Sequence, residues 1–589
     1  MSHPTQQFLH NTLSSVDARL LISGGSVFAG AADAEYDARV LTKSATIISS
    51  DGAGSEVNLP SVQTINAGWD DVWSGMRNQV ISADNGGTVD FSGVTQIIAP
   101  IRVEDRLDII VNNDGANNSL IDLGGLQTLS SARDGDTLFD IAAGVNLPLS
   151  NLTTASNAQF DLDTNATLAF AGLTSHDLGS YALASGAAVN APVLTAMTNV
   201  SLTLANGSQF DGSASLVDIS GSTVTLSHPT QQFLHNTLSS VDARLLISGG
   251  SVFAGASDTE YDARVLAKSA TIISSDGAGS EVNLPSVQII NAGWDDVWSG
   301  ARTQVISASN GGTVDLSGVT QIISPWRTED SLDIIAETGG LIDLSSLQSV
   351  APPAGRSSQT HLSVQNAGTM IFGDMPLMEN THITVADLAS TLDINGSAQL
   401  TSGSFTMAGG ATVTVSGNFA HEFTDETNLQ AASAIMHMDG AGTFADPQLL
   451  EVGGLDAGLG DPGNDGNFGF GQLILGTDLQ PTVVSLIDVF DNGNRASPEA
   501  LYLFGLGGPD GLLLKGDSTL VIGDIPVYAK IDGDWTLLND LFPDGVSKID
   551  FAALTGNPAD MGHVALPEPA TLSLLALGGL AILRRRRKS

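Results

Sequence analysis

The chain has 589 residues, 22 of them basic and 64 acidic, and its formal net charge at pH 7 is −42. Such an acidic chain repels nucleic acid and anionic membrane surfaces, so nucleic-acid binding is excluded as a function. Cysteine is absent, which excludes disulfides and thiolate metal sites, and an apolar fraction of 42% indicates a packed protein instead of a disordered acidic one.

The first feature along the chain is a long internal repeat. Residues 2–110 match residues 227–335 after a shift of 225 positions, with twelve differences. Near-identity over this length indicates a recent duplication within an array. Met1 occupies the position that Leu226 has in the second copy. We therefore expect a truncated N-terminus, so that the lack of a signal peptide carries no information about the compartment.

A shorter pattern recurs within each copy and consists of an apolar strand, an Asp/Asn/Gly turn and the frame V-[DN]-L-x-x-[LV]. Alternation such as Val89-Asp90-Phe91 places the apolar side chains on one face of a half-buried strand. The first three anchor positions are spaced by 32 residues. The anchors are Val57, Val89, Ile121, Val145, Leu168 and Val189 in the first copy, and Val282, Val314 and Ile342 in the second.

Units of this size bury their apolar face only by stacking on one another. We therefore predict an all-β protein, a parallel β-helix or solenoid followed by a smaller β-module and one C-terminal transmembrane helix. A leucine-rich horseshoe is the alternative, because V-D-L-x-x-L has a similar cadence, but the usual Asn of that frame is missing. The predicted domains are residues 1–226 (first copy), 227–445 (second copy and further rungs), 446–563 (β-module) and 564–589 (sorting signal).

The motif NAGWDDVWSG is the strongest candidate for surface chemistry and occurs at residues 66–75 and 291–300. Indole faces stack on sugar rings, and paired carboxylates bind hydroxyls or Ca²⁺ or act as acid and base on glycosides. The alternative is a loop whose Trp side chains cover the edge of a rung while its Asp side chains are solvated. The candidate glycan-contact residues are Trp69, Asp70, Asp71, Trp73, Trp294, Asp295, Asp296 and Trp298.

Further along the chain, His421-Glu422 begins like a zinc-protease motif, but Asp425 stands where the second His is needed. No nucleophile elbow or phosphate-binding loop is found. We therefore assign no catalytic residue.

From about residue 449 the sequence changes to strands separated by DNG, PDG and DGD turns, which favour hairpins. Residues 449–456, 467–476, 486–494 and 516–528 resemble a module of large surface proteins from planctomycete-like bacteria. One loop offers oxygen ligands for Ca²⁺, the candidate cofactor, although ordinary turn chemistry explains the same residues and the EF-hand frame does not fit. These candidate ligands are Asp461, Asn464, Asp465 and Asn467.

The chain ends in Pro567, Glu568 and Pro569, an uncharged stretch from Ala570 to Leu583, and a basic cluster that contains Arg584, Arg585, Arg586 and Arg587. The uncharged stretch is shorter than the roughly 20 residues of a typical membrane span, but snorkelling arginines extend its reach. The basic end is expected to stay in the cytoplasm and the acidic bulk outside. Without the five terminal basic residues, 17 basic residues remain against 64 acidic ones, a net charge of about −47.

The order of these three parts resembles the PEP-CTERM sorting signal of Gram-negative bacteria, over residues 564–589. The resemblance implies that a membrane exosortase recognises Pro567, Glu568 and Pro569 and cleaves near them. It also implies an exported protein that one C-terminal helix anchors in the inner membrane before processing, and that afterwards lies at the cell surface or outside the cell.

Two classes of function remain open. The first is a non-enzymatic surface or matrix protein with a structural or adhesive role. The second is a carbohydrate-active β-helix, a lyase or hydrolase acting on an extracellular polysaccharide, in which Arg102 or Arg327 would join the Asp/Trp groove. An ice-binding solenoid is less favoured, because it needs Thr-x-Thr on successive rungs and the sequence has it only at 223/225 and 412/414.

Overall fold

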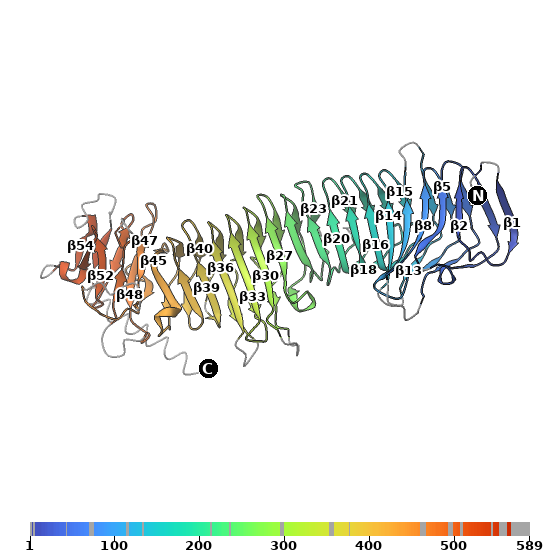
Figure 1. Cartoon of the computed structure of the whole chain (residues 1–589). Helices are drawn as coiled ribbons and strands as arrows, with labels where there is room; N and C mark the ends of the chain where they lie inside the picture. The colour runs from blue at the N-terminus through green and yellow to red at the C-terminus, as the bar shows by residue number, and fades with distance from the viewer. Residues whose placement is uncertain are drawn as a thin grey trace. The chain divides into compact units, whose positions relative to one another are not determined.

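The computed structural model describes residues 3, 6–42, 44–69, 76–113, 117–131, 135–212, 215–234, 237–294, 300–352, 358–375, 377–459, 467–492, 499–506, 510–542, 546–552 and 562–566. The chain divides into two compact units. Unit 1 comprises Met1–Leu266 and Ile272–Asn283, and unit 2 comprises Ala267–Thr271 and Leu284–Ser589. In each unit, successive short strands pair in parallel and lie side by side along a sheet (Figure 1).

Unit 1 is built from strands that return to the same face once per rung. One face is the sheet β1-β3-β6-β9-β12, and a later one is β15-β17-β19-β21. The strands are β1 (Gln7–Leu13), β2 (Leu20–Ser23), β3 (Val27–Ala31), β4 (Glu35–Asp37), β5 (Ala45–Asp51), β6 (Glu56–Asn58), β7 (Thr64–Asn66), β8 (Arg77–Asp84), β9 (Thr88–Asp90), β10 (Gln96–Ile98), β11 (Asp105–Val111), β12 (Leu120–Asp122), β13 (Thr128–Ser130), β14 (Asp136–Ile141), β15 (Asn146–Pro148), β16 (Thr154–Leu162), β17 (Thr167–Ala169), β18 (Ser175–Leu183), β19 (Ala188–Asn190), β20 (Ala196–Leu204), β21 (Gln209–Asp211), β22 (Thr223–Leu226), β23 (Gln232–Leu234), β24 (Arg244–Ser248), β25 (Val252–Ala254), β26 (Glu260–Asp262) and β28 (Glu281–Asn283); β27 (Ala270–Asp276) lies where the two units divide.

Unit 2 is also built from parallel sheets, such as β41-β44-β46-β48-β51-β55. Two antiparallel pairs, β52–β53 and β54–β55, occur near the C-terminal end of the described residues. Its strands are β29 (Ile289–Asn291), β30 (Thr303–Ser309), β31 (Thr313–Asp315), β32 (Gln321–Ile323), β33 (Ser331–Glu337), β34 (Leu341–Leu344), β35 (Ser349–Ala351), β36 (Gln359–Gln365), β37 (Thr369–Phe372), β38 (Leu377–Met378), β39 (Thr381–Val385), β40 (Thr391–Ile394), β41 (Ala398–Leu400), β42 (Ser404–Met407), β43 (Thr412–Val415), β44 (Phe419–His421), β45 (Leu429–Met438), β46 (Gln448–Glu451), β47 (Phe470–Leu475), β48 (Val483–Ile487), β49 (Leu501–Leu503), β50 (Leu512–Leu514), β51 (Thr519–Val521), β52 (Val527–Ile531), β53 (Asp534–Leu537), β54 (Lys548–Asp550) and β55 (His563–Ala565).

The prediction of an all-β parallel solenoid is confirmed by these pairings. The leucine-rich horseshoe is wrong, because in the described residues the labelled helices are 3₁₀ turns of three or four residues and no helix covers a sheet. These turns are η1 (Ala38–Val40), η2 (Ala263–Val265), η3 (Glu426–Asn428) and η4 (Leu538–Leu541). The domain boundaries proposed from the sequence stay predictions.

The anchor spacing corresponds to the register of the rungs. Val89 is paired with both Val57 and Ile121, so the 32-residue period brings three anchors into one inward-facing column. The anchor expected at Val145 is wrong, because Leu147 is the residue that pairs with Leu168. Both Val145 and Leu147 are buried, so burial alone does not identify which of them is the anchor.

The aspartate that recurs in the V-D-L frame has a direct structural role at the corners of the rungs. The Oδ1 atoms of Asp90 and Asp122 accept hydrogen bonds from the backbone N–H groups two residues later, at 2.8 Å each. The aspartate of the V-D-L frame therefore holds the corner after an inward-facing valine. Glycine is required where rungs approach closely, as at Gly87, where a Cβ atom would lie 2.0 Å from the carbonyl oxygen of Ser50.

Aromatic side chains form a ladder inside unit 1. The rings of Phe139 and Phe160 stack at 5.1 Å between centroids, and those of Phe160 and Tyr181 stack at 5.2 Å. All three side chains are fully buried. Because equivalent positions repeat along the solenoid, one aromatic residue per rung produces continuous stacking, which adds to the hydrophobic stabilisation.

Candidate functional site

The NAGWDDVWSG motif of the first copy begins at a buried polar cluster. Trp69 is 6% exposed, and its Nε1–H donates to Oδ2 of Asp105 at 2.9 Å. The other oxygen of Asp105 accepts from the backbone N–H of Arg77 at 3.1 Å. The Arg77 guanidinium, also buried, places Nη1 3.8 Å from Oδ2 of Asp105. One carboxylate thus ties the start of the motif loop to strands β8 and β11.

The second copy has the same arrangement within unit 2. Trp294 is 4% exposed and donates from Nε1 to Oδ2 of Asp330 at 3.1 Å. The backbone N–H of Arg302 donates to Oδ1 of Asp330 at 3.0 Å. In both copies the bonded tryptophan and aspartate are 36 residues apart in the chain. The contact therefore forms only when neighbouring rungs are stacked.

The structure therefore describes only the first tryptophan of each motif, and it turns that indole inward. Such a buried ring corresponds to the alternative in which tryptophan covers a rung, because a sugar-stacking ring needs an exposed face. The other proposed glycan-contact residues lie outside the described residues, and for them the assignment stays a prediction. These are Asp70, Asp71, Trp73, Asp295, Asp296 and Trp298.

The two arginines considered for an enzymatic groove are engaged on the surface. Arg102 Nη2 lies 2.7 Å from Oε1 of Glu104, with both side chains about one-third exposed. Arg327 Nη1 lies 3.1 Å from Oε1 of Glu329. Each is thus paired with a glutamate two residues away in the sequence.

Of the proposed calcium ligands, the structure describes Asn467. Its Oδ1 accepts from the backbone N–H of Leu455 at 2.7 Å, and its Nδ2 donates to the carbonyl oxygen of Leu455 at 3.0 Å. Asn467 thus closes the base of the loop, while Asp461, Asn464 and Asp465 lie outside the described residues. Elsewhere in the described chain, no group of three His, Asp or Glu side chains is arranged to hold a metal ion.

Carboxylates do stack between rungs of unit 1. Asp51 and Asp84 are register partners on β5 and β8. Asparagines bridge them to the next rung, because Asn85 Nδ2 donates to Asp51 Oδ1 at 2.7 Å and Asn112 Nδ2 donates to Asp84 Oδ1 at 2.8 Å. Further along, burial and then the nearby Asp161 raise the pKa of the Asp140 carboxyl. Repulsion between rungs is therefore relieved in part by amide donors.

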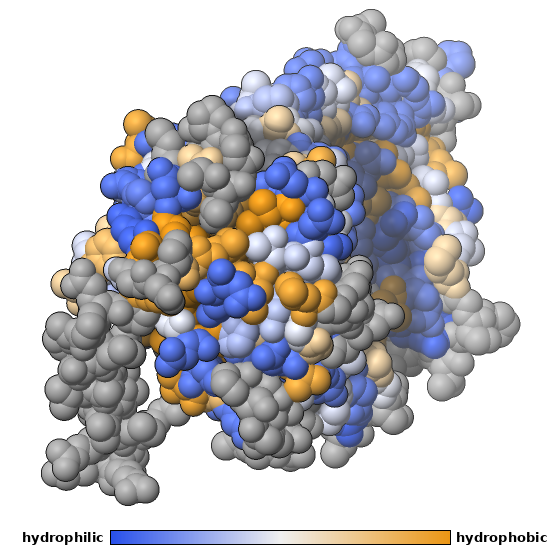
Figure 2. Space-filling view, turned by 90° about the vertical axis from the view of Figure 1, so that its left-hand side faces the viewer, coloured by the Kyte–Doolittle hydropathy of each residue, from blue (hydrophilic) through white to orange (hydrophobic). Residues whose placement is uncertain are grey.

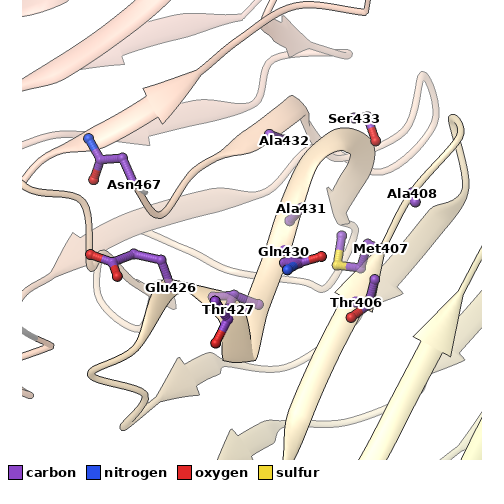
Figure 3. A pocket seen from close by; sticks show the side chains of 11 residues that line it. Thr406, Met407, Ala408, Glu426, Thr427, Gln430, Ala431, Ala432, Ser433 and Asn467 are labelled. Atoms are coloured by element: carbon purple, nitrogen blue, oxygen red, sulfur yellow. The ribbon is translucent and has the colours of Figure 1, made fainter. Parts of the chain in front are cut away.

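A cavity of about 400 Å³ opens in unit 2 beside β42, η3 and β45 (Figure 3). Among its described lining residues, Glu426 supplies the one carboxylate, and Gln430 and Asn467 supply amides. Glycoside hydrolysis generally uses two carboxylates that flank the bond. The lining described here therefore supplies half of such a pair.

Unit 2 also contains a buried polar cluster that the sequence patterns did not indicate. Oε1 of Glu451 accepts from the backbone N–H groups of Val489 and Phe490 at 2.9 and 2.8 Å. The Glu451 side chain is nearly fully buried, and this burial raises the pKa of its carboxyl to about 8, with Asp488 and Glu499 nearby adding to the shift. Asn492 links this region to His421, because its backbone N–H donates to Glu499 Oε1 and its Nδ2 lies beside the His421 ring. Burial lowers the pKa of the His421 imidazole to about 3.

The one available sequence signal for this cluster was His421, considered there with Glu422 as an incomplete zinc motif. Because strand neighbours point to opposite sides, His421 faces inward, where Asn492 Nδ2 lies 3.4 Å from its Nδ1. Glu422 faces the other way and accepts from Gln399 at 2.9 Å. The contact between His421 and Asn492 spans 71 residues, which no local pattern predicts.

The sorting tail is known from its sequence alone, because residues 567–589 lie outside the described part of the chain. That range includes the sorting motif Pro567, Glu568 and Pro569 and the whole predicted anchor from Ala570 to Arg587. In the part that the structure does describe, no helix has the length and apolarity to cross a membrane.

Comparison with known proteins identifies this tail. Residues 565–588 match the family described as the PEP-CTERM protein-sorting motif. No curated protein and no solved structure matches the chain. The sorting motif indicates an exported protein and implies processing by exosortase.

Proposed function

We propose that this chain is a non-enzymatic protein of the cell surface or extracellular matrix, in which an acidic β-solenoid has a structural or adhesive role. The observation that carries the proposal is a PEP-CTERM sorting motif at residues 565–588 of a chain that is otherwise a parallel solenoid. Figure 2 shows polar and apolar residues interspersed on the end of unit 2 that faces the viewer. Exposed apolar side chains such as Phe444, Leu455 and Leu459 offer contacts for adhesion.

The alternative function, a carbohydrate-active β-helix, gains no added support from the described residues that were considered for its active site. Trp69 and Trp294 are buried, Arg102 and Arg327 pair with glutamates, and the unit 2 cavity presents one carboxylate among its described residues. Release of unsaturated or reducing sugars from an acidic polysaccharide would contradict the proposal if it were lost in the double variant Asp70→Ala with Asp295→Ala.

We expect the mature protein to be shorter than the translated chain and to lie outside the inner membrane. Exosortase cleavage near Pro567, Glu568 and Pro569 would remove the apolar segment and the basic cluster. Intact-mass measurement of the extracellular or surface form checks this, and a Glu568→Ala variant serves as the comparison, since it should remain with the inner membrane. Detection of Arg584 to Arg587 on the mature form would contradict processing.

Calcium is expected to stabilise the solenoid more than sodium does at the same ionic strength. The chain before the basic cluster has a net charge of about −47, and Asp51 and Asp84 lie side by side on neighbouring strands. Both salts screen this repulsion equally at matched ionic strength, and Ca²⁺ is expected to bind the carboxylates specifically as well. A cation at ten times its dissociation constant adds about 1.4 kcal/mol per site. The measurement is thermal unfolding in matched CaCl₂ and NaCl, and equal melting temperatures would remove the calcium proposal.

A further inference from the structure

One sheet face of unit 2 carries a column of polar side chains on four neighbouring parallel strands. The register places Asp333 of β33 beside His361 of β36, His361 beside His382 of β39, and His382 beside Ser404 of β42. The two imidazole rings are 5.5 Å apart between centroids, at 60°. The His361 side chain is 41% exposed. Two imidazoles therefore lie on adjacent rungs within reach of solvent.

Each ring is oriented through its Nδ1 atom by a residue on the far side. His361 Nδ1 lies 2.8 Å from Oδ1 of Asp333, and His382 Nδ1 lies 2.8 Å from the hydroxyl of Ser404. An ionised carboxylate only accepts, so the hydrogen lies on His361 Nδ1, which donates it. The Ser404 hydroxyl can accept from His382 in the same sense. A neutral imidazole held in this way presents its lone pair at Nε2, as in metal-binding histidines with a carboxylate partner.

Two distances around His361, which are also ordinary for a hydrogen bond and for rings on adjacent strands, fit neighbouring ligands on one ion. Its Nε2 atom lies 3.2 Å from Oε1 of Gln359. Two ligand atoms that are each about 2.0–2.1 Å from a tetrahedral metal lie about 3.3 Å apart. By the same geometry, two imidazoles on one ion have their centroids about 5–6 Å apart, which includes the distance between His361 and His382.

The first copy provides an internal comparison, since Asp108 corresponds to Asp333. Asp108 accepts from Arg106 Nε at 2.5 Å and from Asn78 Nδ2 at 2.6 Å. The second copy has Ser331 and Thr303 at these two positions, and their hydroxyls lie 3.1 Å from each other. Asp333 thus lacks the partners that its counterpart has.

The residues beside the aspartate differ as well. Asp108 is followed across the rungs by Leu138 and then Gln159, whereas Asp333 is followed by His361 and then His382. His361 and His382 lie beyond residue 335, where the match between the copies ends, so only Asp333 of this column has a counterpart in the first copy. Compared with Asp108, the aspartate at this place on the surface has no arginine two residues before it, and two histidines follow it on the next rungs.

We propose that His361 and His382, together with Oε1 of Gln359, bind a divalent transition metal ion that prefers imidazole, such as Cu²⁺ or Zn²⁺. Asp333 is a positioning residue that orients His361. Two imidazoles and one amide leave coordination positions for water, so binding is moderate and stronger for Cu²⁺ than for Zn²⁺. The ion joins β36 to β39 and thereby links adjacent rungs on the surface of an acidic protein.

The test uses the full chain, freed of metal by a chelator and titrated calorimetrically with CuCl₂ and ZnCl₂ at neutral pH. We expect one binding event that weakens at least tenfold in His361→Gln and in His382→Gln. His563→Gln is the matched control, because His563 Nε2 also pairs with an aspartate, Asp517, at 2.7 Å, and it should bind as the wild type does. Asp333→Asn should weaken binding about 10- to 100-fold.

Electron paramagnetic resonance of the Cu²⁺ form supplies a second readout, in which the two imidazole nitrogens appear as hyperfine splitting that each His→Gln variant reduces. Far-UV circular dichroism verifies that each variant is folded. If one histidine variant fails to fold, the other is compared with the wild type. Wild-type affinity and splitting in both His361→Gln and His382→Gln would overturn the proposal, as would an equal loss in His563→Gln.

Discussion

Replacement of Asp105 by alanine is expected to lower the free energy of unfolding of the surrounding rungs by about 3–5 kcal/mol, the usual range when one partner of a buried ion pair is removed. Asp105 is 1% exposed and accepts from Trp69 Nε1 and from the backbone of Arg77. Its loss would leave the indole N–H without this acceptor and the buried guanidinium without a carboxylate 3.8 Å away.

Hydrogen–deuterium exchange of β8 and β11 is the appropriate measurement, because a solenoid opens locally and a global melting temperature averages over many rungs. Asp105→Asn keeps an acceptor for Trp69 but removes the charge, so it should have an intermediate effect. Glu104→Ala breaks the surface pair with Arg102 and should change stability by less than about 1 kcal/mol. Equal exchange in Asp105→Ala and Glu104→Ala would refute the assignment of a buried charge cluster.

Glu451 is expected to make the part of unit 2 around β46 less stable as pH rises. Its carboxyl has a pKa of about 8 in the folded protein, against a reference value of 4.5. Between these values the folded state holds a proton that the unfolded state has lost. The free energy of unfolding therefore falls with rising pH by up to about 1.4 kcal/mol per unit, and becomes level again above the folded pKa.

Glu451→Gln should remove this dependence and raise stability near pH 9 by about 2–4 kcal/mol, because an amide Oε1 still accepts from Val489 and Phe490. Urea unfolding followed across pH checks the prediction. Glu422→Gln is the matched control, since Glu422 accepts from Gln399 and is only partly buried. An unchanged pH profile in Glu451→Gln would contradict the assigned cause.

His421, in the same part of unit 2, acts in the opposite direction at low pH. Burial lowers the pKa of its imidazole to about 3, from a reference value of 6.5. Below 6.5 the unfolded state takes up a proton that the folded state refuses, so stability is lost as pH falls toward 3. The two contributions oppose each other between the reference values of 4.5 and 6.5, so this part of unit 2 should be most stable in that pH range.

The periodicity of the anchors carried most of the information about the fold. Val57, Val89 and Ile121 were spaced evenly, and they lie in register because a parallel solenoid repeats the same inward position once per rung. Where the spacing became irregular, the prediction placed the anchor at Val145 instead of Leu147. Both residues are apolar and buried, and only the pairing of Leu147 with Leu168 distinguishes them.

The sequence by itself determined the corner aspartates of the V-D-L frame and the sorting tail, because each depends on residues that are close together in the chain. It also determined the stacking period, because the same pattern recurs at even spacing. Tertiary structure alone decided the orientation of Trp69, the environment of Glu451 and the pairing of His361 with His382. The bond from Trp69 to Asp105 spans 36 residues and the contact between His421 and Asn492 spans 71. A side chain's burial and partners depend on which rung lies beside it, so composition and spacing identified these residues without revealing what they contact.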